Sequence, residues 1–158
     1  MKKQAQSSHC FVCGVENPSG LKMKFYDVAP GVVETTHIVS ENYEGYPGVV
    51  HGGIIASMMD EVMGRVFMGT DDPRFMVTAE LKIRYRKPVP IQQKLTLRGE
   101  AVSDNGRVAR ATGSIHGPDG ALLVEGEIVV ANIPDRLVPP MEHQSLGWRV
   151  YPDQEEVG

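Results

Sequence analysis

Cysteines and long apolar runs are scarce in this sequence, and each scarcity excludes a class of protein. Its two cysteines, Cys10 and Cys13, are too few and too close together for the disulfide framework of a small secreted domain. No apolar run approaches the roughly 18 residues that cross a bilayer. The residues after Lys3 are polar, unlike a secretory signal. We therefore expect a reduced, cytoplasmic protein without a membrane partner.

The chain also lacks an excess of basic residues. Its 16 lysines and arginines are outnumbered by 20 aspartates and glutamates, which gives a net charge of −4. This balance excludes the basic surface of a typical nucleic-acid-binding protein, so no nucleic-acid partner is expected. A polyanionic ligand would need a local basic patch. The length of 158 residues suffices for one domain with a buried core.

Turn residues and apolar periodicity divide the chain into elements. Pro30-Gly31, Asn105-Gly106 and Pro118-Asp119-Gly120 mark tight turns. Apolar residues recur at helical spacing from 52 to 68, in a stripe wide enough to predict a largely enclosed helix. The expected strands are residues 22–28, 32–39, 76–86, 94–103, 107–116 and 121–131.

This order of elements predicts an α+β fold. Consecutive strands joined by tight turns pair antiparallel, and an enclosed helix needs a sheet that curves around it. We expect about six strands around the helix, within a domain of residues 22–133. Residues 1–21 form an N-terminal segment with a Cys-x-x-Cys-Gly pattern. Residues 134–158 form a tail whose apolar anchor is Trp148.

One face of the predicted helix combines small residues with a carboxylate. At 100° per residue, this face collects Gly53, Ala56, Ser57, Asp60 and Gly64. Small side chains let a ligand or a second chain approach the backbone closely. A half-buried carboxylate is unfavourable unless it is paired or used, which makes Asp60 a candidate for chemistry. The alternative is that Asp60 caps a loop or pairs with a nearby strand cation such as Arg84.

The neighbouring Glu61 has a different environment. It points about 100° away from Asp60, and it precedes Arg65 by four residues, the spacing of an ordinary helix ion pair. We therefore interpret Glu61 as structural and Asp60 as functional.

The start of the helix, His51-Gly52-Gly53, is a second candidate feature. The first N–H groups of a helix lack intrahelical partners, and they can face an oxygen on which negative charge develops. Two glycines leave these donors unobstructed, although such a pair is equally typical of a turn. His51 is either a hydrogen-bonded structural residue or a base.

Three stretches carry a resemblance to a known family. They are GYPGVVHGGIIASMMDE at 45–61, in which Asp60 follows His51 by nine positions, CFVCGVENPSGL at 10–21 and YRKPV at 85–89. These stretches resemble the hotdog-fold thioesterases, and the resemblance covers the chain from about Cys10 to Ala131. The branch it resembles contains the phenylacetic-acid-degradation thioesterases and their mammalian relatives.

The resemblance implies a hotdog fold, in which a curved antiparallel sheet wraps one helix. It also implies a homodimer or homotetramer with active sites at the subunit interface, and hydrolysis of an acyl-CoA substrate without a cofactor. Gly52 N–H would polarise the thioester carbonyl. Asp60 of the facing subunit would act as nucleophile or as general base on water. His51 and Thr78 complete the predicted catalytic residues.

Thr78 matches a position where such enzymes carry a hydroxyl that orients water. Strand alternation, however, places Thr78 with Glu80, Lys82 and Arg84 on the polar face of its strand. The predicted substrate-binding residues are Gly53, Asn42, Arg84, Arg86 and Lys87. The three cations would meet the phosphates of coenzyme A, and the alternative is that they form a solvated sheet face.

No metal is expected. Cys10 and Cys13 form a single Cys-x-x-Cys pair, and His9 beside them makes zinc conceivable, but a closed structural site needs four ligands. We therefore predict a knuckle formed by backbone packing.

Two other functions are kept as alternatives. One is a hotdog protein that binds acyl-CoA or another small molecule without hydrolysing it, which would not need Asp60. The other is a hotdog dehydratase or hydratase, which would need a differently arranged His–Asp pair at the helix start.

Overall fold

The computed structural model describes residues 1–69, 74–134 and 147–153. The central helix is α1 (Gly52–Gly64), and two short 3₁₀ helices are η1 (Glu41–Tyr43) and η2 (Arg65–Phe67). The strands are β1 (Lys2–Lys3), β2 (Tyr26–Ala29), β3 (Val32–Ile38), β4 (Met76–Tyr85), β5 (Lys94–Asp104), β6 (Val108–His116) and β7 (Leu122–Asn132).

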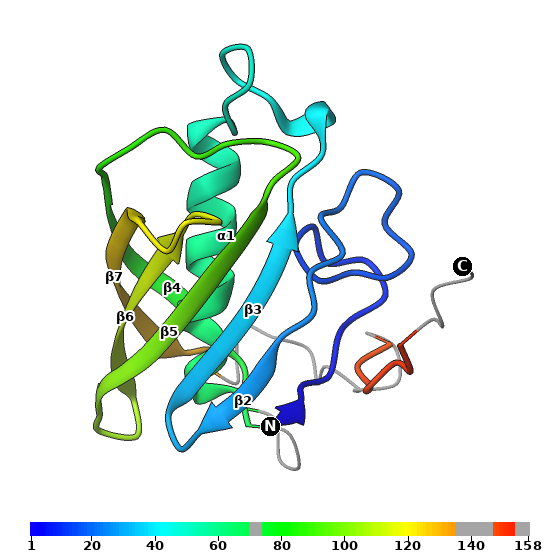
Figure 1. Ribbon diagram of the computed structural model, residues 1–158. Helices are drawn as coiled ribbons and strands as arrows, with labels where there is room; N and C mark the ends of the chain where they lie inside the picture. Colours follow the sequence, from blue (N-terminus) through cyan, green and yellow to red (C-terminus); the bar gives the residue numbers. More distant parts are fainter. Residues whose placement is uncertain (70–73, 135–146, 154–158) are drawn as a thin grey trace.

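The strands form one antiparallel sheet that curves around α1 (Figure 1). Its order is β1-β2-β3-β5-β6-β7-β4, so the ten-residue strand β4 lies at one edge. This is the predicted α+β architecture. No helix within the described ranges is long and apolar enough to cross a membrane.

The four strands after the helix begin and end within one residue of their predicted bounds. The strand predicted at 22–28 is shorter, because Lys22 has a positive φ of 56° and β2 starts only at Tyr26. A seventh strand, β1, was not predicted. It is two residues long and carries no apolar alternation that would mark it.

Helix α1 is enclosed on one side. Its buried residues are Ile55, Met58, Met59, Val62 and Met63. The opposite face, which carries the small residues and Asp60, is only partly covered. The prediction of a largely enclosed helix therefore holds for one face. The reason is that the chain's own sheet covers only the apolar side, and the small-residue side meets no strand that buries it.

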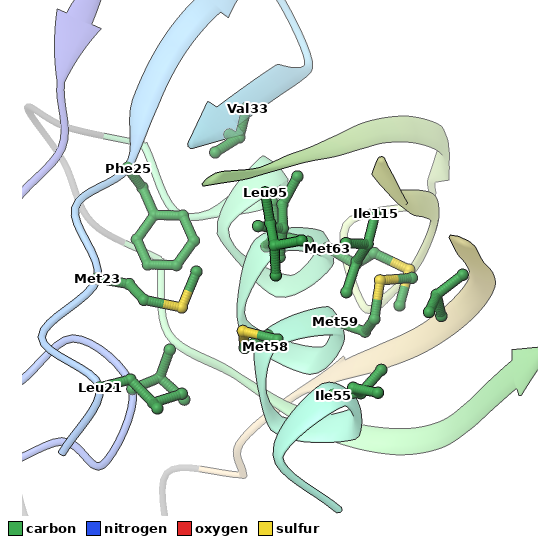
Figure 2. Close-up of a cluster of buried hydrophobic side chains, with 14 of the residues drawn as sticks. Leu21, Met23, Phe25, Val33, Ile55, Met58, Met59, Met63, Leu95 and Ile115 are labelled. Carbon is green, nitrogen blue, oxygen red and sulfur yellow. The ribbon is translucent and has the colours of Figure 1, made fainter. Parts of the chain in front are cut away.

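The segment before β2 closes the core. Figure 2 shows Leu21, Met23 and Phe25 pointing toward α1 from this segment, and Leu95 and Ile115 of the sheet beside the same helix. All five side chains are buried. Residues 1–21 therefore pack on the same core as the sheet. Trp148 of the tail is partly buried against this core, as predicted, and the tail residues 135–146 and 154–158 lie outside the described residues.

A row of three glycines lets α1 approach the sheet closely. Gly99 of β5 pairs with Gly113 of β6, which pairs with Gly126 of β7. A Cβ atom at Gly99 would lie 2.5 Å from the Val62 carbonyl oxygen, and one at Gly113 would lie 2.6 Å from Cγ of Met63. A side chain at either position would therefore force the helix away from the strands.

Gly99→Ala is expected to lower the free energy of unfolding by about 1–3 kcal/mol, because the added methyl group overlaps helix backbone that cannot rotate away. Urea unfolding followed by circular dichroism measures this change. The matched control is Val102→Ala in the same strand, where the side chain is 62% exposed, and its effect should stay within about 0.5 kcal/mol. Equal midpoints for Gly99→Ala and wild type would contradict the packing described for the glycine row.

Candidate active site

His51 caps the start of α1. Its backbone is extended, with φ −59° and ψ 137°, and its Nδ1 accepts a 2.9 Å hydrogen bond from Gly53 N–H. An accepting Nδ1 carries no proton, so the neutral ring holds its proton on Nε2. This contact also occupies the N–H group of Gly53, one of the predicted substrate-binding residues. The structure thus gives His51 the structural function that the sequence left open, and its part in chemistry stays a prediction.

Gly52 presents an N–H group with no acceptor among the described residues. It is the first residue of α1, where the helix dipole favours negative charge. A Cβ atom at Gly52 would meet only the Tyr85 ring, at an ordinary 3.8 Å. Packing inside this chain therefore does not require a glycine here, and the N–H group is open to an approaching oxygen.

Tyr85 fixes the position of Gly52. Its hydroxyl, at the end of β4, donates a 2.8 Å hydrogen bond to the Gly52 carbonyl. Sequence reasoning did not assign Tyr85 to the site. The only available signal was an aromatic hydroxyl at the end of a strand, and nothing in the sequence places that strand end beside the helix start.

If the chain has the acyl-CoA hydrolase activity that its sequence resemblance implies, Tyr85→Phe is expected to lower kcat about 2–10-fold, since one hydrogen bond of about 0.5–1.5 kcal/mol that orients Gly52 is lost. Steady-state kinetics with a fixed acyl-CoA measure the effect. Tyr26→Phe on β2 is the control and should not change kcat. If Tyr85→Phe raises KM and leaves kcat unchanged, Tyr85 contributes to substrate binding instead of positioning Gly52.

Asp60 and Thr78 form the second part of the site. The Thr78 hydroxyl donates a 2.6 Å hydrogen bond to Oδ1 of Asp60. Burial raises the pKa of Asp60 above that of an ordinary aspartate, the hydrogen bond from Thr78 lowers it in part, and the charge of Glu61 raises it further. The result is an oriented carboxylate that is more basic than one in water.

The position of Thr78 corrects the sequence prediction. Simple alternation places Thr78 on the polar face with Lys82 and Arg84, but its hydroxyl reaches Asp60 on α1. The cause is a register shift between Thr78 and Glu80, where Ala79 forms a bulge in β4 opposite β7. The bulge reverses the alternation, so Thr78 faces the helix although the residues after it keep the expected pattern.

The structure tests two ion pairs that the sequence suggested for the acidic residues of α1. Glu61 binds Arg65 through a 2.8 Å contact between Oε1 and Nε, as the spacing predicted. The alternative pairing of Asp60 with Arg84 is wrong. Arg84 is separated from Asp60 by the sheet, and it lines a depression on the outer face together with Lys82 and Arg98.

The other predicted substrate-binding residues do not gather around Asp60 in a single chain. Arg86 forms a 2.6 Å ion pair with Glu125. Lys87 is exposed after the end of β4, with its backbone N–H bound to the Leu123 carbonyl. Asn42 is exposed on η1. The places of these residues in a single chain do not test whether they contact coenzyme A, so that contact stays a prediction.

The two candidate groups of one chain are too far apart to act on the same bond. Gly52 and Asp60 are eight residues apart in a continuous helix, a separation of about 12 Å along the axis. A carbonyl that accepts from Gly52 therefore cannot be attacked through Asp60 of the same helix.

Comparison with known proteins finds one family to which this chain is similar. Residues 47–124 match the model of the Thioesterase superfamily. The rat acyl-coenzyme A thioesterase THEM4 is 28% identical over 125 residues, which are 77% of this chain and 53% of the rat protein. This chain thus spans about half the length of that curated relative.

Solved structures agree in fold. The crystal structure of a thioesterase superfamily protein is 33% identical, with a TM-score of 0.70 over 77% of this chain and 62% of the other. A Streptococcus mutans protein bound to acetyl-CoA is 21% identical, with a TM-score of 0.63 over 69% and 86% of the two chains. The helix wrapped by its antiparallel sheet gives the chain a hotdog fold, and the match over residues 47–124 and these relatives together show that it is similar to the thioesterase superfamily.

Proposed function

We propose that this protein hydrolyses acyl-CoA thioesters, with Asp60 and Gly52 as the reacting groups. The hydrogen bond from Thr78 to Asp60 is the observation that carries this proposal. It holds Oδ1 of a carboxylate that lies on the helix face that its own chain covers only in part. Hydrolysis adds water across the C–S bond, so that the acyl group leaves as a carboxylic acid and coenzyme A leaves as a thiol.

The chemistry follows from the charges that develop. As the thioester carbonyl is attacked, its oxygen becomes negative, and Gly52 N–H at the positive end of α1 stabilises that oxygen. Asp60 either attacks the carbonyl carbon or removes a proton from the attacking water, and its raised basicity favours both steps. Single-turnover hydrolysis in heavy-oxygen water tests for direct attack: label in Asp60 would establish it, because general-base catalysis places the label only in the product acid.

A second copy of the chain would bring the two groups together. In one copy they lie about 12 Å apart along the helix, whereas two helices running in opposite directions would place Gly52 of one copy near Asp60 of the other. The edge strand β4 supports this pairing, since only β7 covers it and Val77 and Tyr85 are 46% and 51% exposed. Small residues on the open face of α1 would let the two helices approach.

Val77→Asp is expected to dissociate the dimer and to abolish most turnover, because it places like charges close together across the paired edge strands. Sedimentation equilibrium and thioester hydrolysis are measured on the same sample. Val102→Asp, at an exposed valine of β5, is the control and should remain dimeric and active. A wild-type chain that is monomeric and fully active would exclude the shared site.

Release of free thiol from a panel of short, medium and aromatic acyl-CoAs tests the function itself. We expect wild type to hydrolyse at least one of them. A folded dimer that releases no thiol, yet binds acyl-CoA in calorimetry, would favour the non-catalytic alternative. Conversion of a β-hydroxyacyl-CoA without thiol release would favour the dehydratase.

A further inference from the structure

The N-terminal segment and α1 bring together three side chains that the proposed reaction does not use. They are Cys10, Cys13 and Glu61, whose sulfur and carboxylate oxygen atoms lie within 4.8 Å of one another. Cys13 is buried, while Cys10 and Glu61 are partly exposed. We propose that these three residues bind a zinc ion, which links the N-terminal segment to the helix that carries Asp60.

The distances suit a tetrahedral thiolate site. Sγ of Cys10 lies 3.9 Å from Oε2 of Glu61. A zinc ion bound at ordinary lengths separates a sulfur ligand from an oxygen ligand by about 3.6 Å, so the Cys10–Glu61 distance needs to change by only a few tenths of an ångström. Two residues between the cysteines is the usual spacing of a zinc-binding pair.

The backbone holds the cysteine pair in a tight turn. Gly14 N–H donates a 2.8 Å hydrogen bond to the Cys10 carbonyl, and Cys13 N–H donates to Cys10 Sγ at 3.5 Å. A Cβ atom at Gly14 would lie 2.3 Å from the Cys10 carbonyl oxygen, so only glycine fits. Both sulfur atoms are therefore oriented by main-chain geometry before an ion arrives.

The surroundings orient the third ligand. Oε1 of Glu61 accepts a 2.8 Å hydrogen bond from Arg65, which leaves Oε2 on the side of the sulfurs. Arg65 is itself only 1% exposed and donates a 2.8 Å hydrogen bond to the Ala5 carbonyl. Carboxylates that bind metals are commonly held in this way by a second residue. Water or the Ser7 hydroxyl, which is 3.9 Å from Cys13 Sγ, would supply the fourth ligand.

The charges around the cluster suit a divalent cation. Two thiolates and Glu61 carry three negative charges, and Arg65 supplies one positive charge. A divalent cation bound to both thiolates and to Glu61 would make the loaded site neutral, which suits a partly buried position.

Cobalt binding tests the site in the full chain. The reduced protein is freed of metal with a chelator and titrated with Co²⁺, and absorption by cobalt bound to thiolate is recorded, followed by competition with Zn²⁺. We expect one equivalent per chain. Cys10→Ser should weaken binding by at least about 100-fold and reduce the thiolate absorption, and Glu61→Gln should weaken it about 10–100-fold and keep that absorption.

Glu16→Gln is the matched control, because Glu16 is an exposed carboxylate of the same segment, and its affinity should equal that of wild type. Cys13→Ser is not used, since Cys13 is 1% exposed and its replacement endangers the fold. The proposal is overturned if the folded, reduced chain gives no thiolate absorption with Co²⁺, or if Cys10→Ser binds as tightly as wild type. Thiol release from acyl-CoA is not read in this experiment, so the two proposals fail separately.

Discussion

Asp60→Asn is expected to lower kcat for acyl-CoA hydrolysis by about 10²–10⁴-fold, the range typical of losing a general base. Asparagine has nearly the same shape and keeps an oxygen that accepts from the Thr78 hydroxyl. The substitution therefore removes the basic oxygen and leaves its surroundings in place. Steady-state kinetics on the best substrate of the acyl-CoA panel measure the loss.

The stability of the same variant separates function from folding. A partly buried carboxylate loses hydration in the folded chain, and a neutral amide loses less, so the melting temperature of Asp60→Asn should equal or exceed that of wild type. Asp119→Asn, in the turn between β6 and β7, is the control for kcat. Near-normal turnover by folded Asp60→Asn would remove Asp60 from the mechanism.

Gly52→Pro is expected to lower kcat by about 10²–10³-fold, the usual effect of deleting one oxyanion donor. Proline removes the N–H group and fits this site in other respects. Gly52 is the first helical residue, where proline is well tolerated, and His51 before it has the extended ψ of 137° that a following proline requires. The helix should therefore form normally, as circular dichroism would verify.

Gly52→Ala is the matched partner of this variant. Alanine keeps the N–H group, and its methyl group meets only the Tyr85 ring at 3.8 Å. It should retain most of the wild-type kcat. A loss of equal size in the alanine and proline variants would show that the site excludes any side chain at Gly52, and that the N–H group is not the source of the rate.

The sequence predicted the parts of this fold that depend on local periodicity. The helix and the four strands after it were predicted because their apolar residues repeat at 3.6 or 2 positions, and turn residues such as Asn105-Gly106 separate them. Asp60 and Gly52 were predicted as candidates on the same basis, since the helix face and the helix start follow from one register. Strand β1 has no such pattern and was missed.

Contacts between distant segments could not be predicted in this way. Tyr85 reaches Gly52 across 33 residues, and Cys10 reaches Glu61 across 51. The residues around each position do not specify these two contacts, because the contacts depend on how β4 and the N-terminal segment pack against α1. Glu61 was correctly paired with Arg65, and that pairing gave no sign of the cysteines on its other side.

The bulge at Ala79 makes the orientation of Thr78 a matter of residue number more than of residue type. If Ala79 instead paired regularly with β7, simple alternation would return and the Thr78 hydroxyl would turn to the opposite face, although every side chain would be unchanged. Substitution scanning along β4 is blind to this dependence. Insertions and deletions in β4 would reveal it, because a change in strand length can shift the register and so change the face on which Thr78 lies.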